Sequence, residues 1–133
     1  MLITIINQFS IYLTSIILGI MLFFSFIVAP VTFTTLDEEN ARKFIRKIFP
    51  YYYIVNLVIS LLVLILFVYI KMFSLNFYLM LVIMVLFALS NFLLMPLINK
   101  FRDNNQEKKF KFSHLISVLI NFVQMIILII ILI

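Results

Sequence analysis

Four apolar stretches, each about twenty residues long, constrain the fold of this chain more than any other feature. They cover residues 10–31, 51–70, 75–98 and 113–133, and each is near the length that a helix needs to cross a hydrocarbon core of about 30 Å. Of the 133 residues, 66% are hydrophobic, whereas a soluble domain is about half apolar. The sequence therefore predicts an all-α membrane protein, an antiparallel bundle of four transmembrane helices in one integral membrane domain, residues 1–133.

A polar stretch separates the first two apolar stretches. Asp37 is a suitable N-cap, and at about 100° per residue the residues after it place bases on one face and apolar side chains on the other. We expect a short amphipathic helix over residues 37–49 that lies on the membrane surface. Pro30 and Pro50 are expected to break the helices on either side of it, as Pro96 does in the third stretch. The bases that would face anionic lipid headgroups or a partner are Arg42, Lys43, Arg46 and Lys47.

Basic residues are divided unevenly among the three connections. The first and third connections hold nine Lys and Arg residues, and the second holds only Lys71. By the positive-inside rule, the first and third connections face the cytoplasm and both termini face outward. We therefore expect a multi-pass protein of the inner cell membrane. Because the positive charge is confined to short connections beside the spans, it argues for lipid contact and against nucleic-acid binding.

The second half of the chain is similar to the first half when it is shifted by 66 residues. Residues Ser25–Pro30 then lie over Asn91–Pro96, and both segments have a Phe second and a Pro last. Each half contains two spans, so the repeats would be parallel, related by an axis along the membrane normal. Chance similarity between two apolar hairpins is the alternative.

Small polar side chains gather at one depth of the predicted bundle. At about 1.5 Å per residue, several of them lie roughly 8–12 Å inside the cytoplasmic boundary, and the outer halves of the last three helices are almost free of them. A water-filled pore would need polar groups along its whole length, so the pattern predicts a cavity open to the cytoplasm. Hydrogen bonding between helices is the structural alternative. The candidate cavity residues are Ser25, Asn56, Ser60, Asn91, Ser117, Asn121 and Gln124.

His114 is the one histidine of the chain and lies at the inner mouth of this predicted cavity. A histidine here can ligate haem iron or a metal, carry a proton, or bond to a loop carbonyl. A metal site with four protein ligands is excluded, because the chain has no cysteine and no acidic residue within the apolar stretches. No catalytic triad, P-loop or dinucleotide fingerprint is present, so the sequence favours a non-enzymatic protein without a cofactor.

Three functions fit these features. The leading hypothesis is a protein that binds or passes a small solute or ion through the polar cavity. The first alternative is a haem- or metal-associated redox protein that uses His114. The second is a scaffold or assembly factor that acts through its basic connections, as a homo-oligomer or with another membrane protein.

Several motifs together resemble a known family. They are Gly19-x3-Phe23-x2-Phe26-x-Val28-Ala29-Pro30-x2-Phe33, Phe49-Pro50-x-Tyr52, Pro96-x2-Asn99-x2-Arg102-Asp103 and His114-x2-Ser117-x3-Asn121. Over nearly the whole chain this pattern resembles the transmembrane protein 205-like domain. The resemblance implies an integral membrane protein of four helices without an assigned activity.

Overall fold

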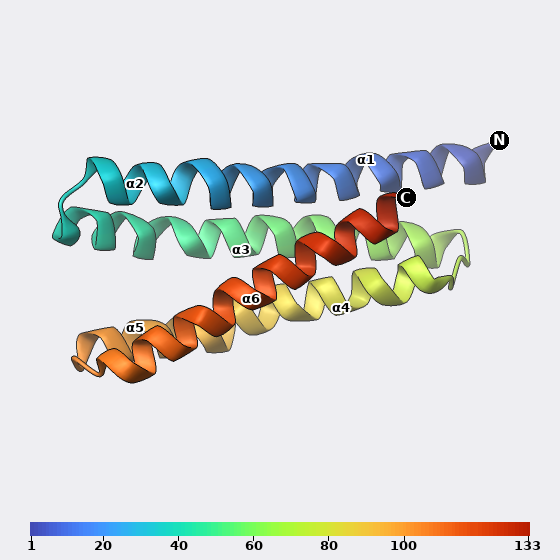
Figure 1. Cartoon of the computed structure of the whole chain (residues 1–133). Helices are drawn as coiled ribbons and strands as arrows, with labels where there is room; N and C mark the ends of the chain where they lie inside the picture. Colours follow the sequence, from blue (N-terminus) through green and yellow to red (C-terminus); the bar gives the residue numbers. More distant parts are fainter.

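The computed structural model describes all residues, 1–133, and consists of helices joined by short turns. Four long helical rods lie antiparallel to their neighbours (Figure 1). The first rod comprises α1 (Leu2–Phe23), the π-helical turn η1 (Phe24–Val28) and α2 (Ala29–Thr35), and the second is α3 (Glu38–Tyr69). The third comprises α4 (Leu75–Leu89), the π-helical turn η2 (Ser90–Leu94) and α5 (Met95–Asp103), and the fourth is α6 (Glu107–Leu132).

All four rods are long and apolar enough to cross a membrane, so this is a multi-pass membrane protein built as an all-α bundle. α1 and α4 each pack against both α3 and α6, so the order around the bundle is α1, α3, α4, α6. The two termini lie at one end of the bundle (Figure 1). The turns that join α2 to α3 and α5 to α6 lie at the other end, which we call the connection end.

Few residues are buried within the bundle. Only 24 of the 133 residues are buried, and large apolar side chains cover the outer faces of all four rods. Exposed apolar surface of this extent would aggregate in water, so these faces contact the lipid bilayer. Each rod contributes fully buried apolar side chains to a single core; among them are Ile17, Val63, Ile83 and Leu128, all 0% exposed.

Residues 37–49 do not form the separate surface helix that the sequence predicts. They are instead the N-cap and first turns of α3, which continues through Pro50 to Tyr69. Asp37 is the N-cap: its carboxylate accepts hydrogen bonds from the side-chain amide of Asn40 at 2.6 Å and from its backbone N–H at 3.3 Å, and these bonds lower the pKa of Asp37. Pro50 removes one helical hydrogen bond, but Ala41 is 1% exposed and α2 packs along this part of α3. Packing therefore keeps α3 in one piece.

Pro30 and Pro96 do not end a helix either. Each lies near the start of an α-helical segment that follows directly on a π-helical turn. A π-helical turn adds one residue to the helix, which makes room for a proline ring that would otherwise clash with the carbonyl four residues earlier. The two π-helical turns are offset by 66 residues, the same offset that relates the two halves of the sequence. The parallel repeat remains a prediction.

Two turns contain a residue with a positive φ angle. Lys71 follows α3 and Asn105 follows α5, and both have φ of 53°. In each turn the next residue bonds back across the helix end, Met72 N–H to Phe67 O at 2.9 Å and Gln106 N–H to Phe101 O at 2.9 Å. This is the Schellman arrangement, whose left-handed position usually holds Gly, or sometimes Asn.

We expect the variant Lys71→Gly to raise the free energy of unfolding by about 0.5–1 kcal/mol, since glycine has no Cβ that would clash in the left-handed conformation. Asn105→Gly should raise the free energy of unfolding by a smaller amount, because asparagine already tolerates this conformation. Lys71→Ala is the control, since it removes the charge and keeps the Cβ. Thermal unfolding in detergent, followed by circular dichroism, measures the differences. Equal melting temperatures for Lys71→Gly and Lys71→Ala would contradict this explanation.

Candidate functional site

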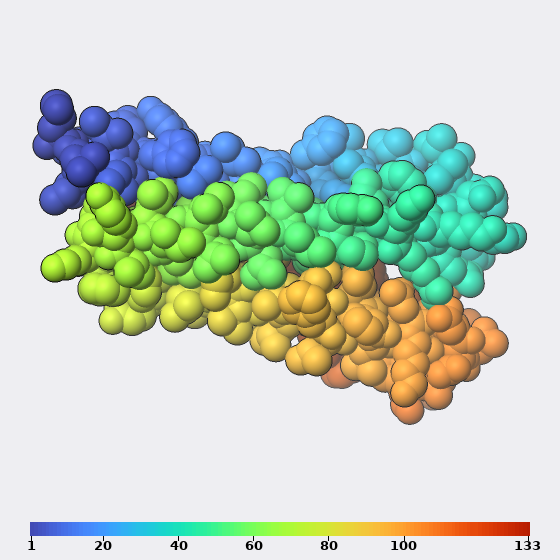
Figure 2. Space-filling model, turned by 180° about the vertical axis from the view of Figure 1, so that it is seen from behind, coloured from blue at the N-terminus to red at the C-terminus, as the bar shows by residue number.

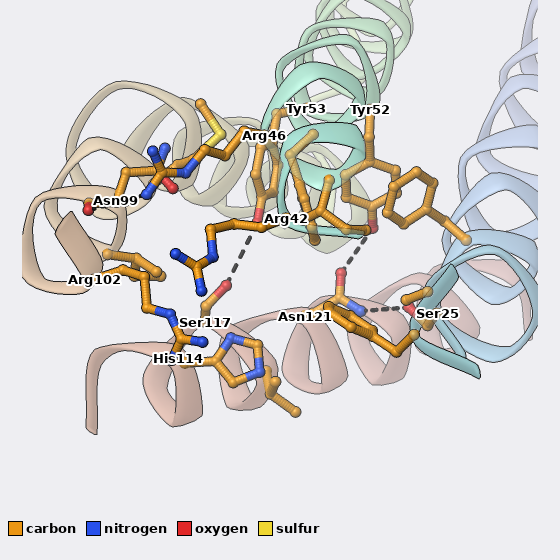
Figure 3. A pocket seen from close by; sticks show the side chains of 18 of the residues that line it. Ser25, Arg42, Arg46, Tyr52, Tyr53, Asn99, Arg102, His114, Ser117 and Asn121 are labelled. Atoms are coloured by element: carbon orange, nitrogen blue, oxygen red, sulfur yellow. Dashed lines mark hydrogen bonds between the residues drawn. The ribbon is translucent and has the colours of Figure 1, made fainter. Parts of the chain in front are cut away.

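A cavity of about 490 Å³ lies at the connection end, between the hairpin of α2 and α3 and the hairpin of α5 and α6 (Figure 3). Helices pack closely within each hairpin, and the two hairpins separate toward this end (Figure 1). From behind, a narrow opening separates the start of α3 (teal) from α5 (orange) in Figure 2. Of the 22 lining residues, 13 are hydrophobic. The volume is in the range of small-molecule sites, roughly 300–1,000 Å³.

The deep end of the cavity contains a hydrogen-bond network that joins three rods (Figure 3). The hydroxyl of Tyr52 on α3 donates to Oδ1 of Asn121 on α6 at 2.7 Å. The side-chain amide of Asn121 donates in turn to the hydroxyl of Ser25 on η1 at 2.9 Å. Beside this network, the hydroxyls of Tyr53 and Ser117 lie 3.4 Å apart. Asn121 therefore joins the two hairpins at the deep end of the cavity.

Aromatic rings form the wall behind these polar groups. The Phe24 ring lies 4.4 Å from that of Tyr52 and 5.2 Å from that of Phe49, edge-on to the latter. The Tyr53 ring stacks on Phe49 at 5.7 Å. Edge-to-face and stacked rings fill space with little freedom of movement. This wall closes the cavity toward the core of the bundle.

The π-helical turn η1 positions the first member of the network. Ser25 lies within η1, and its hydroxyl accepts the bond from Asn121. Most other serine and threonine side chains on the rods bond instead to the carbonyl four residues earlier, as Thr14 and Thr32 do. The π-helical turn that accommodates Pro30 therefore also places Ser25 at the cavity.

Ion pairs bridge the two hairpins at the mouth of the cavity. Glu38 on α3 accepts from Arg42 at 2.9 Å and from Arg102 on α5 at 2.6 Å. Arg46 binds both carboxylate oxygens of Asp103 and also donates to a backbone carbonyl of α5. The guanidinium of Arg102 lies 4.7 Å from the centre of the Phe110 ring, a cation–π contact. The mouth is therefore positively charged and lined with oriented guanidinium groups.

His114 lies at this mouth, on the α6 side (Figure 3). Its ring stacks on Phe110, with centroids 5.9 Å apart and planes at 7°. No three residues among His, Cys, Asp and Glu lie close enough together to hold a metal ion. In this position His114 can donate or accept one hydrogen bond toward a bound molecule.

The structure divides the predicted cavity residues into two groups. Ser25, Ser117 and Asn121 line the cavity together with His114. Two residues predicted for the lipid or partner surface, Arg42 and Arg46, also line it, whereas Lys43 and Lys47 do not. The remaining predicted residues lie outside the lining and are buried among the rods; they are Asn56, Ser60, Asn91 and Gln124.

These four buried residues show what a polar side chain does away from the cavity. The Gln124 amide donates to the carbonyl of Ile83 on α4 at 3.3 Å, which links two helices. Asn56 and Ser60 donate to carbonyls of their own helix. The carbonyl oxygens of the Asn56 and Asn91 side chains have no hydrogen-bond partner.

Sequence reasoning missed several lining residues. Tyr52 and Tyr53 were not among the predicted cavity residues, although Phe49, Tyr52 and Asn56 are spaced by three and four residues and so share one helix face. That spacing was the available signal. Glu38 and Arg102 could not be placed in this way, because their bond joins residues 64 apart in the chain.

The chain is similar to a known protein family. The family described as "Domain of unknown function (DUF4149)" matches residues 12–107. This range begins within α1, covers the rest of the first rod and the next two rods, and ends at the start of α6. No curated protein and no solved structure matches the chain.

We expect Asn121→Leu to lower the free energy of unfolding by about 1 kcal/mol, because it removes two hydrogen bonds between rods worth about 0.6 kcal/mol each in membranes. Asn91→Leu is the matched control: its side-chain oxygen has no partner, so its replacement should be neutral or stabilising. Unfolding in detergent with increasing denaturant provides the measurement. An equal loss of stability in both variants would show that the network at Asn121 contributes nothing specific.

Proposed function

The chain belongs to the DUF4149 family, a domain of unknown function, and we propose that the protein binds or passes a small solute or ion at the cavity between its two hairpins. The observation that carries this proposal is the joint placement of Ser25, Ser117 and Asn121 at one cavity whose mouth holds arginines. Few converging polar groups within a mostly apolar wall are typical of ligand sites. The description of the family names no activity.

The shape of the bundle favours a binding site reached from one end. Beyond the aromatic wall, residues such as Ile17, Val63 and Leu128 are fully buried and fill the space between the rods. A molecule that enters at the connection end therefore meets a closed core. If a solute is passed on, the rods have to rearrange, and η1, which lines the cavity with Phe24, Ser25 and Phe26, lies in the wall where such a change would act.

The residues behind the two alternatives support the same proposal. A haem protein would use His114, and this ring lines the cavity, stacked on Phe110. A scaffold would use the bases of the first connection, but Arg42 and Arg46 line the cavity and pair with acids. We therefore assign the histidine and both arginines to the binding site.

We extend the proposal to the family resemblance. Many of the motif residues that are similar to the transmembrane protein 205-like domain line the cavity, among them Ala29, Asn99, Arg102 and Asn121. These residues come from three rods and are far apart in sequence. A binding site shared by the two families would account for their joint occurrence.

Native mass spectrometry of gently extracted protein tests the proposal. We expect the wild type to carry a small molecule and Ala29→Phe to lose it, at least tenfold in occupancy, because the new ring would fill the cavity that Ala29 lines. Val31→Phe is the matched control, since Val31 lies on the same helix, is 54% exposed and is not part of the lining. Equal occupancy in both variants would contradict binding in this cavity.

We also propose that the connection end faces the cytoplasm, because nine of the ten bases lie there. The chain has no cysteine, so single cysteines can be labelled without background. With a membrane-impermeant maleimide, Ser74→Cys should react in intact cells, and Asn104→Cys only after the membrane is opened. The reverse pattern would overturn the orientation.

A further inference from the structure

We propose that the ligand of this cavity is an anionic phospholipid of the adjacent leaflet, with its phosphate at Arg42 and Arg102 and an acyl chain between α2 and α6. This inference rests on the proposed binding site between the hairpins and assigns a membrane lipid to it in place of a small water-soluble solute. A lipid bound in this way would have its acidic headgroup between the two hairpins and would hold them together. A basic surface that only contacts the membrane would not hold the hairpins together.

The charges at the mouth favour an anion. Three arginines line the cavity, and Glu38 is the one acid among the lining residues. One oxygen of Glu38 serves both Arg42 and Arg102, and the other N–H groups of these two guanidiniums have no protein partner. Their side chains are only 43% and 32% exposed, so water replaces the missing partners only in part. A phosphate group matches the forked donors of arginine.

In Figure 3 the guanidinium groups of Arg42 and Arg102 point into the same space, in front of His114 and Ser117. A phosphate in that space would have arginine donors on two sides and the imidazole and hydroxyl groups within the same cavity. Arg46 differs, because both of its terminal nitrogens already bind Asp103 or a carbonyl. The site for the anion is therefore defined by the two arginines that share Glu38.

The apolar part of the cavity opens sideways. Phe26 lies on η1, Phe33 on α2 and Phe122 on α6; all three line the cavity and are 58%, 62% and 48% exposed. Exposed rings at the edge of a membrane-spanning bundle contact acyl chains. A small water-soluble anion would make no use of these rings, whereas a lipid chain would lie along them.

The arginine pair and the apolar part of the cavity lie at depths that match the headgroup and the acyl chain of a lipid in the bilayer. α3 has 32 residues and is about 48 Å long at 1.5 Å per residue, which exceeds a hydrocarbon core of about 30 Å. Arg42 lies in the first turns of α3 and Arg102 in the last turn of α5, beyond the apolar stretches, at the level of headgroups. From water toward the membrane centre, the two guanidinium groups come first, level with Phe33, and the rings of Phe26 and Phe122 lie deeper. A phospholipid has the corresponding order of phosphate, then acyl chain.

Native mass spectrometry of the purified full chain, with equal amounts of phosphatidylglycerol and phosphatidylcholine of the same acyl chains, tests the inference. We expect bound phosphatidylglycerol to exceed bound phosphatidylcholine at least fivefold. Glu38→Gln should raise this ratio severalfold further, because it removes the acid that competes for both arginines. Glu39→Gln is the matched control, since Glu39 pairs with Lys43 outside the cavity lining. A gain in binding cannot result from misfolding.

The converse variant should lose the preference. Arg42→Gln is expected to bring the ratio of the two lipids close to one, and Lys43→Gln, the same change of charge at the next residue, should keep it. Circular dichroism confirms that both variants fold. Equal ratios in Arg42→Gln and Lys43→Gln would overturn the assignment of the anion to the cavity.

Other occupants give different results. Inorganic phosphate at millimolar concentration that displaces the lipid would indicate a site for free anions and would overturn the inference, as would a protein dimer without lipid. If both lipids bind equally and Ala29→Phe still removes them, the headgroup assignment is wrong and the proposed function stands. If no bound molecule is sensitive to Ala29→Phe, both proposals are wrong.

Discussion

The lipid core cannot hydrogen-bond to the backbone, so every rod must remain helical wherever it crosses the membrane. This constraint explains how the chain accommodates its three prolines. Pro30 and Pro96 follow π-helical turns and Pro50 lies within α3, yet none of them ends a rod. Proline changes the local path of the helix and leaves it unbroken. At η1 that change positions the serine that bonds to Asn121.

The bundle is held differently at its two ends. Toward the termini, fully buried apolar side chains from all four rods pack against one another, and Gln124 adds a bond to α4. At the connection end the rings of Phe24, Tyr52 and Tyr53 fill the space, and two ion-pair groups cross the gap between the hairpins. Exposed ion pairs contribute about 0–1 kcal/mol each, so the hairpins are joined more weakly there than in the core.

The architecture could be predicted from the sequence because four apolar stretches of this length are compatible with few arrangements in a membrane other than four spanning helices. The ends of the helices could not, because the hydrogen bond lost at Pro50 competes with packing along α2, and packing cannot be judged from one segment. The candidate site was predictable only in part. Depth along a helix follows from counting residues, but direction does not: Asn121 faces the cavity, whereas at a similar depth Asn56 bonds to its own helix and Gln124 to α4.

The basic residues illustrate the same limit and show why the cavity has its charge. On one helix face, Arg42 and Arg46 were indistinguishable from Lys43 and Lys47 as bases for the membrane surface. Because α3 is continuous, its first turns lie beside α5. Arg46 binds Asp103 and a carbonyl across the gap, and Arg42 shares Glu38 with Arg102 of α5. Glu38 contributes one carboxylate to two guanidiniums, so the mouth keeps an unbalanced positive charge next to an apolar interior. An acidic group joined to an apolar chain satisfies both parts of such a site at once.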